Sequence, residues 1–494
     1  MSNVQPNILD GIDLPDQFPL LSSPYDEFLW LENTALDDLI ATIATEIDAL
    51  SDRKKRDRRT SKKFIFAIKS IVLNLLNLNR TNPKILLAIP KGSSAFTCRS
   101  RYGQKLLAYK PFIDAYDGLM QLDYIEVAKR GFWNKDQGRG EVTRIKITDK
   151  LLSLVNKVVP QETVIFIRYP GEECIRLKDE DKKLVDYADT KYTQQSRADL
   201  NVINKCLNRH WYDLDMTDTD FQKMYQRIQS KHDLGIDDPQ PCVGFSSRSM
   251  YRVFNNGKGG RSKANFTQGG RFYGGWWQSI PSEYRKCITI DGKWTVELDY
   301  SNLHPHMVYA EAGLQLNSDA YKIEGCLDRN MAKLAFNALL NANGRIKKPD
   351  GYNDAAVGMG WSELLDAIVK RHEPIKDYFR TGYGLKLMFT DSEIANRIML
   401  YYANKDIPCL SVHDSFIMQH GYQDELQELM LDQYRAVTDH AISIKSDDGY
   451  EWAVRRYKDS TTTFYTGITE TDVLEASNNN SQTARRWRSW LEQK

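Results

Sequence analysis

The sequence lacks an excess of charge of either sign. It carries 67 Lys plus Arg against 66 Asp plus Glu, a formal net charge of +1 at pH 7. Overall charge therefore does not indicate a nucleic-acid partner, and only local clusters of basic residues can do so. Cysteine is also scarce, with seven residues in 494 and no Cys-x-x-Cys pair. These spacings disfavour a disulfide framework or a zinc ribbon and predict mostly buried thiols in a reducing compartment.

Long apolar runs are lacking as well. None nears the roughly 18–20 residues that a membrane-spanning helix needs. The N-terminus, MSNVQPNILDGIDLP, has neither the basic start nor the apolar core of a secretory signal. The sequence predicts a cytoplasmic protein without a membrane partner, in a bacterial or phage-like host. A hydrophobic content of 41% suits sizeable cores, and the length suits about two to four domains.

The first part of the chain favours helices and one basic hairpin. Apolar spacing predicts helices over 36–50, 64–79 and 111–122, a strand over 84–90, and a helix from Asp149. Residues 124–148 are typical of two strands around a polar, glycine-rich loop. This order resembles a winged helix whose hairpin carries Phe132 and Trp133 among basic residues, which suits phosphate contact with base stacking. The predicted contacts are Lys129, Arg130, Lys135 and Arg139. A plain surface hairpin or a protein-binding wing is the alternative.

Two further segments are basic. The run DRKKRDRRTSKK at 52–63 holds eight Lys or Arg against two Asp. It is either a solvated, flexible connection or an arm that contacts phosphates. After residue 465 the composition turns polar, and the final ARRWRSWLEQK either touches nucleic acid or docks on the protein.

Two aspartates stand at the ends of strand-like segments. Residues 294–298 alternate as a strand does and end at Asp299. In 407–419, two apolar runs flank His413-Asp414, which predicts a hairpin with Asp414 at its turn. Because buried charges are paired or bind metal, we expect Asp299 and Asp414 to meet and to hold two divalent ions. Mg²⁺ fits, since it prefers oxygen ligands and arrives with substrate phosphates. The alternative is a purely structural role as strand-end caps.

A helix over 326–344 carries polar residues every four positions on one face: Arg329, Lys333, Asn337 and Asn341. Arg and Lys one turn apart suit a triphosphate clamp, although this segment taken alone favours an ordinary amphipathic helix. Just before the Asp299 strand, three polar residues stand among aromatics: Arg271, Gln278 and Arg285. A loop packed on the domain surface is the alternative there.

Together, and in this order, these segments resemble family A DNA polymerases, the DNA polymerase I type. The family's TGR…NLQNIP…R segment is similar to GRFYGGWWQSIPSEYR (270–285), and its DYSQIELR motif to DYSNLH (299–304). Its RxxxKxxxF helix is similar to RNMAKLAFN (329–337), and its VHDE motif to VHDS (412–415).

The sequence also departs from that family. His304 stands where the family has the Glu that blocks the sugar 2′-hydroxyl, Asn337 replaces Phe, and Ser415 replaces the Glu after His-Asp. His-Asp-Ser is similar to single-subunit RNA polymerases of phages and mitochondria, whereas DYSNLHPHM and KLAFNA are similar to family B DNA polymerase motifs. Sugar and template choice therefore stay open, although a bulky His304 favours deoxynucleotides.

The resemblance implies an α+β fold. We expect a right-hand polymerase with an antiparallel palm sheet, helical fingers, a thumb-like region and an N-terminal winged-helix-like module. The expected parts are an acidic segment with a basic linker (1–63), the winged-helix-like module (64–160), a helical thumb-like region (161–245), palm and fingers (246–470) and a polar, basic tail (471–494).

The resemblance also implies roles. Asp299 and Asp414 hold two Mg²⁺, with Mn²⁺ as a substitute, and the Tyr300 carbonyl is a further ligand. Arg329 and Lys333 bind the incoming triphosphate, and Lys333 protonates the leaving pyrophosphate. The remaining predicted contacts are His304, Asn337 and Asn341 with the nucleotide, and Arg271, Gln278, Arg285 and His413 with the primer and template.

The predicted activity is template-directed DNA synthesis, with a DNA primer–template and dNTPs as partners. An RNA template stays open, as do RNA synthesis, primer synthesis, reverse transcription and untemplated addition at the same site. An alternative of another class is a non-catalytic DNA-binding protein of replication or regulation.

Overall fold

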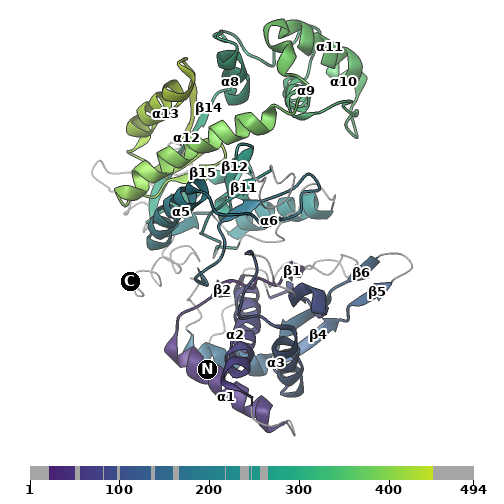
Figure 1. The fold of residues 1–494 in the computed structure, drawn as a ribbon, viewed down its shortest axis with the longest axis vertical. Coiled ribbons are helices and arrows are strands. Elements are labelled where there is room, and N and C mark those ends of the chain that lie inside the picture. Colours follow the sequence, from purple (N-terminus) through teal and green to yellow (C-terminus); the bar gives the residue numbers. More distant parts are fainter. Residues whose placement is uncertain are drawn as a thin grey trace.

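The computed structural model describes residues 22–50, 56–81, 83–96, 101–134, 139–159, 166–216, 218–233, 244–245, 247–255 and 265–448. These residues form two lobes, one above the other in Figure 1. One hydrophobic core includes residues from Leu29 to Phe166, and the other includes residues from Ile175 to Ile442. Tyr225 packs against both cores. The cores therefore divide the chain between residues 166 and 175.

In its described residues, the lower lobe contains four helices and a small sheet. The helices are α1 (Thr34–Ala49), α2 (Arg58–Thr81), α3 (Tyr109–Gln121) and α4 (Asp149–Val158), with the short 3₁₀ turn η1 (Ser93–Phe96). The sheet has the order β1 (Ser22–Pro24), β3 (Leu86–Ile89), β7 (Thr143–Ile147) and β4 (Ile125–Lys129). Among its described strands, only β1 and β3 run parallel.

A long hairpin extends from this sheet. Beyond β4 and β7 it continues as β5 (Phe132–Asn134) and β6 (Arg139–Glu141), and Figure 1 shows it projecting away from the helices. A separate pair, β2 (Leu29–Trp30) and β8 (Ile167–Arg168), closes the lobe by joining its first and last described segments.

Local sequence explains the helices of this lobe. The Asn33 side chain caps α1 by accepting a hydrogen bond from the Leu36 amide, and the Thr148 hydroxyl caps α4. Leu36, Ile40 and Ile47 lie on one face of α1 and are buried. The helices predicted over 36–50, 64–79 and 111–122 and from Asp149 are confirmed, as are the strand over 84–90 and the hairpin over 124–148.

The basic run at 52–63 is only partly as expected. A flexible connection is wrong for its second part, because α2 begins at Arg58. Before it, Arg56 pairs with Asp48 and Asp114, and its guanidinium lies 3.7 Å from the centre of the Phe64 ring. The boundary expected at residue 63 falls inside this helix. Residues 51–55 lie outside the described residues.

The upper lobe is built on an antiparallel sheet. Its order is β10 (Tyr212–Leu214), β13 (Ile288–Ile290), β14 (Lys293–Tyr300), β16 (Ser415–Gln419) and β15 (Leu410–Val412), and β17 (Ile444–Asp448) also pairs with β14. A second sheet has the order β12 (Gly269–Tyr273), β11 (Tyr251–Phe254) and β9 (Ile175–Leu177).

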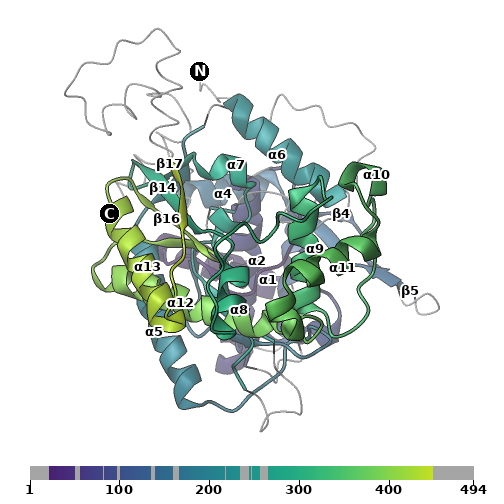
Figure 2. The ribbon, with the colours of Figure 1, turned by 90° about the horizontal axis from the view of Figure 1, so that it is seen from above.

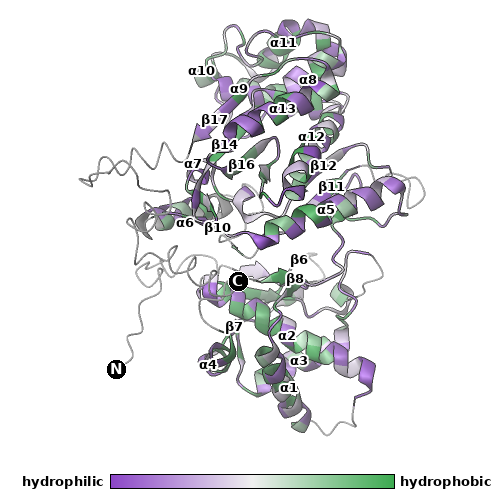
Figure 3. Ribbon diagram, turned by 90° about the vertical axis from the view of Figure 1, so that its left-hand side faces the viewer, coloured by the Kyte–Doolittle hydropathy of each residue, from purple (hydrophilic) through white to green (hydrophobic). Residues whose placement is uncertain are grey.

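Helices complete the described part of this lobe. They are α5 (Lys191–Arg209), α6 (Asp218–Asp233), α7 (Ser282–Arg285), α8 (Leu303–Glu311), α9 (Arg329–Asn341), α10 (Asp354–Val357), α11 (Trp361–Arg371), α12 (Gly384–Asn404) and α13 (Gln423–Thr438), with 3₁₀ turns η2 (Trp276–Gln278) and η3 (Glu373–Tyr378). Figures 1 and 2 place α9, α10 and α11 on the opposite side of this lobe from α13. Figure 3 shows that most helices carry both hydrophilic and hydrophobic residues, as helices on a core do.

The predicted mixture of helices and antiparallel sheets is confirmed. The region expected as thumb-like contains α5 and α6, together with the strands β8, β9 and β10. The names palm, fingers, thumb and winged helix stay predictions. The tail at 471–494 lies outside the described residues. Within the described part of the chain, every helix is too short or too polar to cross a membrane.

Candidate functional site

The ends of β14 and of the β15–β16 hairpin bring Asp299 and Asp414 together. Asp299 stands directly opposite Ser415 in the antiparallel ladder, and Asp414 immediately precedes Ser415 in the turn. His413 forms the other half of that turn with a φ of 60°. This left-handed conformation is unfavourable for a residue with a side chain and is often found at functional sites. The expected meeting of the two aspartates at adjacent strand ends is thus present.

The electrostatics of the pair are unfavourable without a cation. Burial raises the pKa of Asp299 to about 7, and the charges of Asp414 and Glu297 add to the rise. Lys333 and Lys445 lower the pKa but do not cancel the rise, although Lys445 on β17 stands opposite Asp299 in the ladder. A divalent ion between the two carboxylates would remove this cost by favouring their ionised forms.

The donor atoms at this end of the sheet fit Mg²⁺ or Mn²⁺. Both predicted ligand side chains are carboxylates, and hard divalent ions prefer oxygen. The Tyr300 side chain is turned away, because its hydroxyl donates a hydrogen bond of 2.5 Å to the Met430 carbonyl inside the core. Only the backbone of Tyr300 is therefore available as a ligand, in agreement with its predicted role, which stays a prediction.

Glu297 is a neighbour that the sequence analysis missed. It precedes Asp299 by two residues on β14, so both side chains share one face of the sheet. Its carboxylate accepts two hydrogen bonds of 2.8 Å from Arg285 and one of 2.6 Å from the Ser415 hydroxyl. Arg285, expected at the primer, is thus engaged inside the protein. The alternation of residues along β14 was the signal that would have revealed Glu297.

Asp391 on α12 is the second missed residue. It is almost completely buried and holds two predicted site residues: Arg271 donates hydrogen bonds to both of its oxygens, and His304 Nε2 lies 2.8 Å from one of them. Burial alone would raise the pKa of Asp391, but hydrogen bonding to His304 and the charge of Arg271 hold it below its usual range. The signal in the sequence was a single acidic residue on an apolar helix face, between Leu387 and Ile394.

The predicted clamp on α9 is exposed and begins at a capped helix end. The Asp328 carboxylate accepts hydrogen bonds from the Asn330 and Met331 amides. Arg329 donates to both oxygens of Asp319, at 2.7 and 2.9 Å. Lys333, one turn on, is exposed and lies near enough to Asp299 to lower the pKa of that carboxyl. The start of α9 therefore contributes positive charge near the aspartate pair.

The other two residues predicted on α9 lie one and two turns further along the helix. The Asn341 side chain donates 2.8 Å to the Asn337 carbonyl, and it packs so closely on Gly384 that a Cβ there would lie 2.2 Å from its Oδ1. Contact of Asn337 or Asn341 with a nucleotide stays a prediction.

Gln278 and His413 line a cavity of about 920 Å³ between the two lobes. Gln278 donates hydrogen bonds of 3.0 Å to the Phe272 and Ser411 carbonyls. His413 Nδ1 is buried and has no hydrogen-bond partner among the described residues, and burial lowers the pKa of its ring. The wall from the lower lobe includes Arg168. Two of the four predicted primer contacts, Gln278 and His413, thus line a cavity that the lower lobe also lines.

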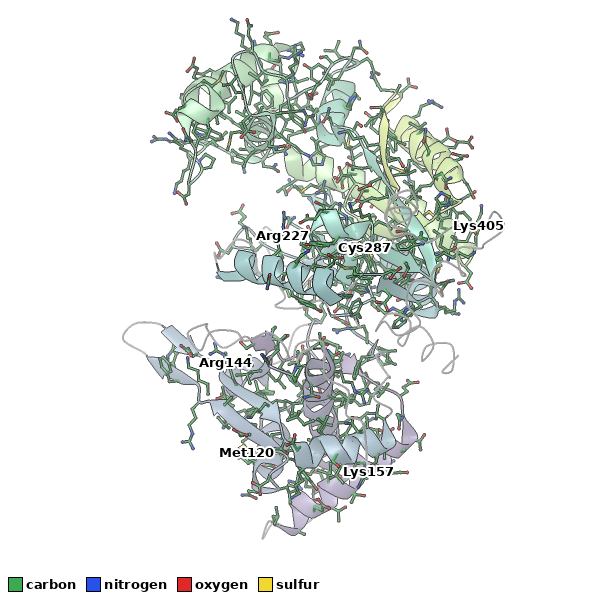
Figure 4. The ribbon with its side chains drawn as sticks, turned by 180° about the vertical axis from the view of Figure 1, so that it is seen from behind. Met120, Arg144, Lys157, Arg227, Cys287 and Lys405 are labelled. Carbon is green, nitrogen blue, oxygen red and sulfur yellow. The ribbon has the colours of Figure 1, made fainter. Side chains whose placement is uncertain are left out.

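The hairpin of the lower lobe exposes aromatic rings beside basic groups. Phe132 is 57% and Trp133 70% exposed, and Arg130 is exposed as well. Lys129 pairs with Glu141 at 2.5 Å, so part of the basic charge is neutralised locally. Lys135 lies outside the described residues, and for Arg139 only the backbone is described. Arg144 on the same hairpin is labelled in Figure 4.

Comparisons with known proteins add little to this geometry. No protein-family model matches the sequence, and a comparison with curated proteins found no match. Among solved structures, the chain is similar to the POL domain of Pol1 from M. smegmatis in complex with DNA primer-template and dNTP. The identity is 14% and the TM-score 0.29, over 84% of this chain and 72% of that chain. A TM-score of this size does not establish a shared fold. The function is therefore inferred from the chain's own residues.

Proposed function

We propose that this protein is a nucleotidyltransferase that extends a nucleic-acid primer, with dNTPs and a DNA template as its substrates. The observation that carries the proposal is the pair Asp299 and Asp414 at neighbouring strand ends, with the pKa of Asp299 raised to about 7. Paired carboxylates of this kind hold divalent ions in enzymes that transfer nucleotides.

In this reaction, side chains and one backbone carbonyl of the protein would bind the metal ions and the triphosphate. Asp299 and Asp414, with the Tyr300 carbonyl, would hold two Mg²⁺ or Mn²⁺. When bound, the ions supply a more acidic attacking hydroxyl and charge stabilisation of the leaving group. Arg329 and Lys333 would bind the triphosphate oxygens, and the Lys333 ammonium would give a proton to the departing pyrophosphate. Catalysis by such a site is mainly positioning and charge stabilisation.

The choice of sugar would depend on His304. Its ring is held by the buried Asp391, which also holds Arg271. An imidazole fixed in this way presents a constant steric barrier, whereas a freely rotating side chain would not. This fixed position supports discrimination against the additional hydroxyl of ribonucleotides.

The arrangement of sheets and helices supports assigning the palm, the fingers and the winged helix to parts of the chain. The antiparallel sheet around β14 would be the palm, and α9, α10 and α11 the fingers. In the lower lobe, the chain order α2, β3, α3 and the β4–β7 hairpin, with β7 between β3 and β4, supports a winged helix. Its exposed Phe132 and Trp133 support base stacking by the hairpin.

Extension of a labelled primer tests the proposal. Wild-type protein with Mg²⁺ and dNTPs on a DNA template is expected to extend the primer. Asp299→Asn and Asp414→Asn are expected to lose at least about 10³-fold in rate, because each removes a ligand charge. Asp424→Asn, an exposed position on α13, is the matched control and should keep the rate.

Parallel reactions separate the alternatives. Extension with rNTPs only would overturn the sugar assignment and keep the metal site. Extension on an RNA template only would make the enzyme a reverse transcriptase. If no substrate is extended with any metal, primed or unprimed, while duplex DNA still binds tightly, the protein is a non-catalytic DNA-binding protein and the proposal fails.

A further inference from the structure

A second group of residues of the types that bind metal ions lies at the other end of β14. Cys206 and His210 stand one turn apart at the end of α5, and Asp406 follows the end of α12. One ligand atom from each, a thiol sulfur, a ring nitrogen and a carboxylate oxygen, lie within 4.8 Å of one another. Figure 4 labels Lys405, the residue before Asp406, at the edge of the upper lobe.

This group is separate from the aspartate pair. Its neighbour Asp291 lies in the turn between β13 and β14, eight residues before Asp299. At about 3.3 Å per residue, a strand of that length spans roughly 26 Å. The chemistry differs as well, because a thiol and an imidazole favour softer ions than Mg²⁺.

His210 is oriented as metal-binding histidines are. Its Nδ1 lies 2.5 Å from Asp291 Oδ2, and its Nε2 lies 3.5 Å from Asp406 Oδ1. Histidine ligands almost always donate their second ring N–H to a carboxylate or carbonyl, which directs the other nitrogen towards the metal. Here that other nitrogen is buried and faces the Cys206 thiol and the Asp406 carboxylate. Asp291 also accepts a hydrogen bond from the Trp211 amide, which fixes the carboxylate.

The backbone favours a cation at the same place. The helix α5 ends at Arg209 and α12 ends at Asn404, so the carbonyl ends of two helices converge on the group. Helix C-termini carry partial negative charge and stabilise cations nearby. The burial also varies across the group, since Cys206 is buried and Asp406 is exposed. An ion can therefore reach the site from solvent on the Asp406 side.

We propose that Cys206, His210 and Asp406 bind one Zn²⁺-class ion, with Asp291 orienting the histidine. Thiolate, imidazole and carboxylate are the ligand types that zinc takes, and three protein ligands leave a fourth position for water. The ion would connect the end of α5 to the end of α12 and to the β13–β14 turn. Its role would be to stiffen the base of the sheet that carries the aspartate pair.

The competing explanation is a network without metal. Arg209 forms an ion pair with Asp406, and a protonated His210 can sit between Asp291 and Asp406. In that case the charged side chains neutralise one another without a metal ion, and Zn²⁺ would bind only weakly and nonspecifically. The two explanations differ in whether the Cys206 sulfur bonds to the ion.

Cobalt substitution tests this directly. The full chain is stripped with a chelator and titrated with Co²⁺, which gives an intense thiolate-to-metal charge-transfer absorption when a cysteine sulfur is a ligand. We expect saturation at one ion per chain, loss of the band in Cys206→Ser, and the same band in Cys174→Ser, the matched thiol control. Zn²⁺ should displace Co²⁺ and abolish the band.

Two further variants test the site even if Cys206→Ser fails to fold. Asp406 is exposed, so Asp406→Asn should fold normally and weaken Zn²⁺ binding by at least about 10-fold. Asp291→Asn should weaken it by roughly 10–100-fold through the histidine. Asp299→Asn should leave the band unchanged, which separates this site from the polymerase proposal. No charge-transfer band in wild type, or a band that persists in Cys206→Ser, overturns the proposal.

Discussion

At the scale of single residues, the raised pKa of Asp299 ties stability to pH. A carboxyl whose pKa is about 7 in the folded state and about 3.9 in the unfolded state favours folding below pH 4, and this contribution is lost as pH rises to 7. At about 1.4 kcal/mol per unit the loss amounts to at most about 4 kcal/mol. Without divalent ions, ionised Asp299 therefore destabilises the fold.

Asp299→Asn should remove this penalty. In chelator, we expect the variant to melt at a higher temperature than wild type at about pH 8, and the difference should shrink at about pH 5, where much of the penalty is absent. Thermal melts by circular dichroism measure both. A difference that does not change with pH would mean that the environment of Asp299 does not disfavour its charge.

Mg²⁺ should act in the opposite direction on wild type. Because an ion that binds only the folded state stabilises it, Mg²⁺ should raise the melting temperature of wild type at about pH 8 and raise that of Asp299→Asn much less. Asp424→Asn serves as the control and should respond as wild type does. An equal response of all three proteins would place the Mg²⁺ site elsewhere.

Asp391 is a second residue whose contribution to the free energy of unfolding can be measured. Asp391→Asn would leave Arg271 without its counter-charge, and removing one partner of a buried pair costs about 3–5 kcal/mol. Urea unfolding should show a loss of that order. Combining it with Arg271→Met should recover part of the loss, since both charges are then gone. A single-variant loss under about 1 kcal/mol would show that the pair is well solvated.

At the scale of elements, the β4–β7 hairpin is the test of nucleic-acid contact. Phe132 and Trp133 are largely exposed, so replacing either with Ala should leave the melting temperature unchanged. If their rings stack on bases, each change should weaken binding to single-stranded DNA by about 1–3 kcal/mol in fluorescence anisotropy. Leu50→Ala removes a similarly exposed apolar group on the end of α1 and is the control. Unchanged DNA binding in both aromatic variants would make the hairpin a plain surface feature.

The same hairpin makes a prediction about salt. Replacing Arg130, Lys135 and Arg139 together with Ala should reduce the slope of log binding constant against log salt by about 0.7–0.9 for each phosphate that the variant no longer neutralises. Lys146 pairs with Glu126 at 3.2 Å on the same hairpin, and Lys146→Ala is therefore the matched control with a smaller effect. An unchanged slope in the triple variant contradicts the role of the hairpin.

At the scale of the whole molecule, the two separate cores predict partial independence. The lower core includes residues from Leu29 to Phe166, and the β2–β8 pair closes it. A fragment of residues 1–170 should therefore fold by itself and melt in one cooperative transition. Circular dichroism and hydrogen exchange of the fragment check this. A broad, non-cooperative melt would show that packing against the upper lobe, such as that of Tyr225 on α6, is needed for folding.

Local patterns in the sequence were sufficient for the elements and for part of the site. Apolar spacing predicted α1, α2 and α3, and polar spacing predicted α9, because a helix that covers a core repeats its buried and its exposed residues at a fixed period. Asp299 and Asp414 were predicted to meet because each ends a buried strand, and a charge in that position requires a partner. That inference required only that the two strands pair with each other, and it required no other contact between residues distant in the sequence.

Only the tertiary structure decided which residues pair with one another around the aspartates. Arg271 pairs with Asp391, 120 positions away, and Ser415 binds Glu297, 118 positions away. Cys206 and His210 share a helix face that the sequence displays, but Asp406 and Asp291 join them only when α12 and the β13–β14 turn pack at the end of α5. The physical reason is that periodicity reports which side of an element is buried, whereas specific ion pairs and ligand sets depend on which elements the packed core places side by side.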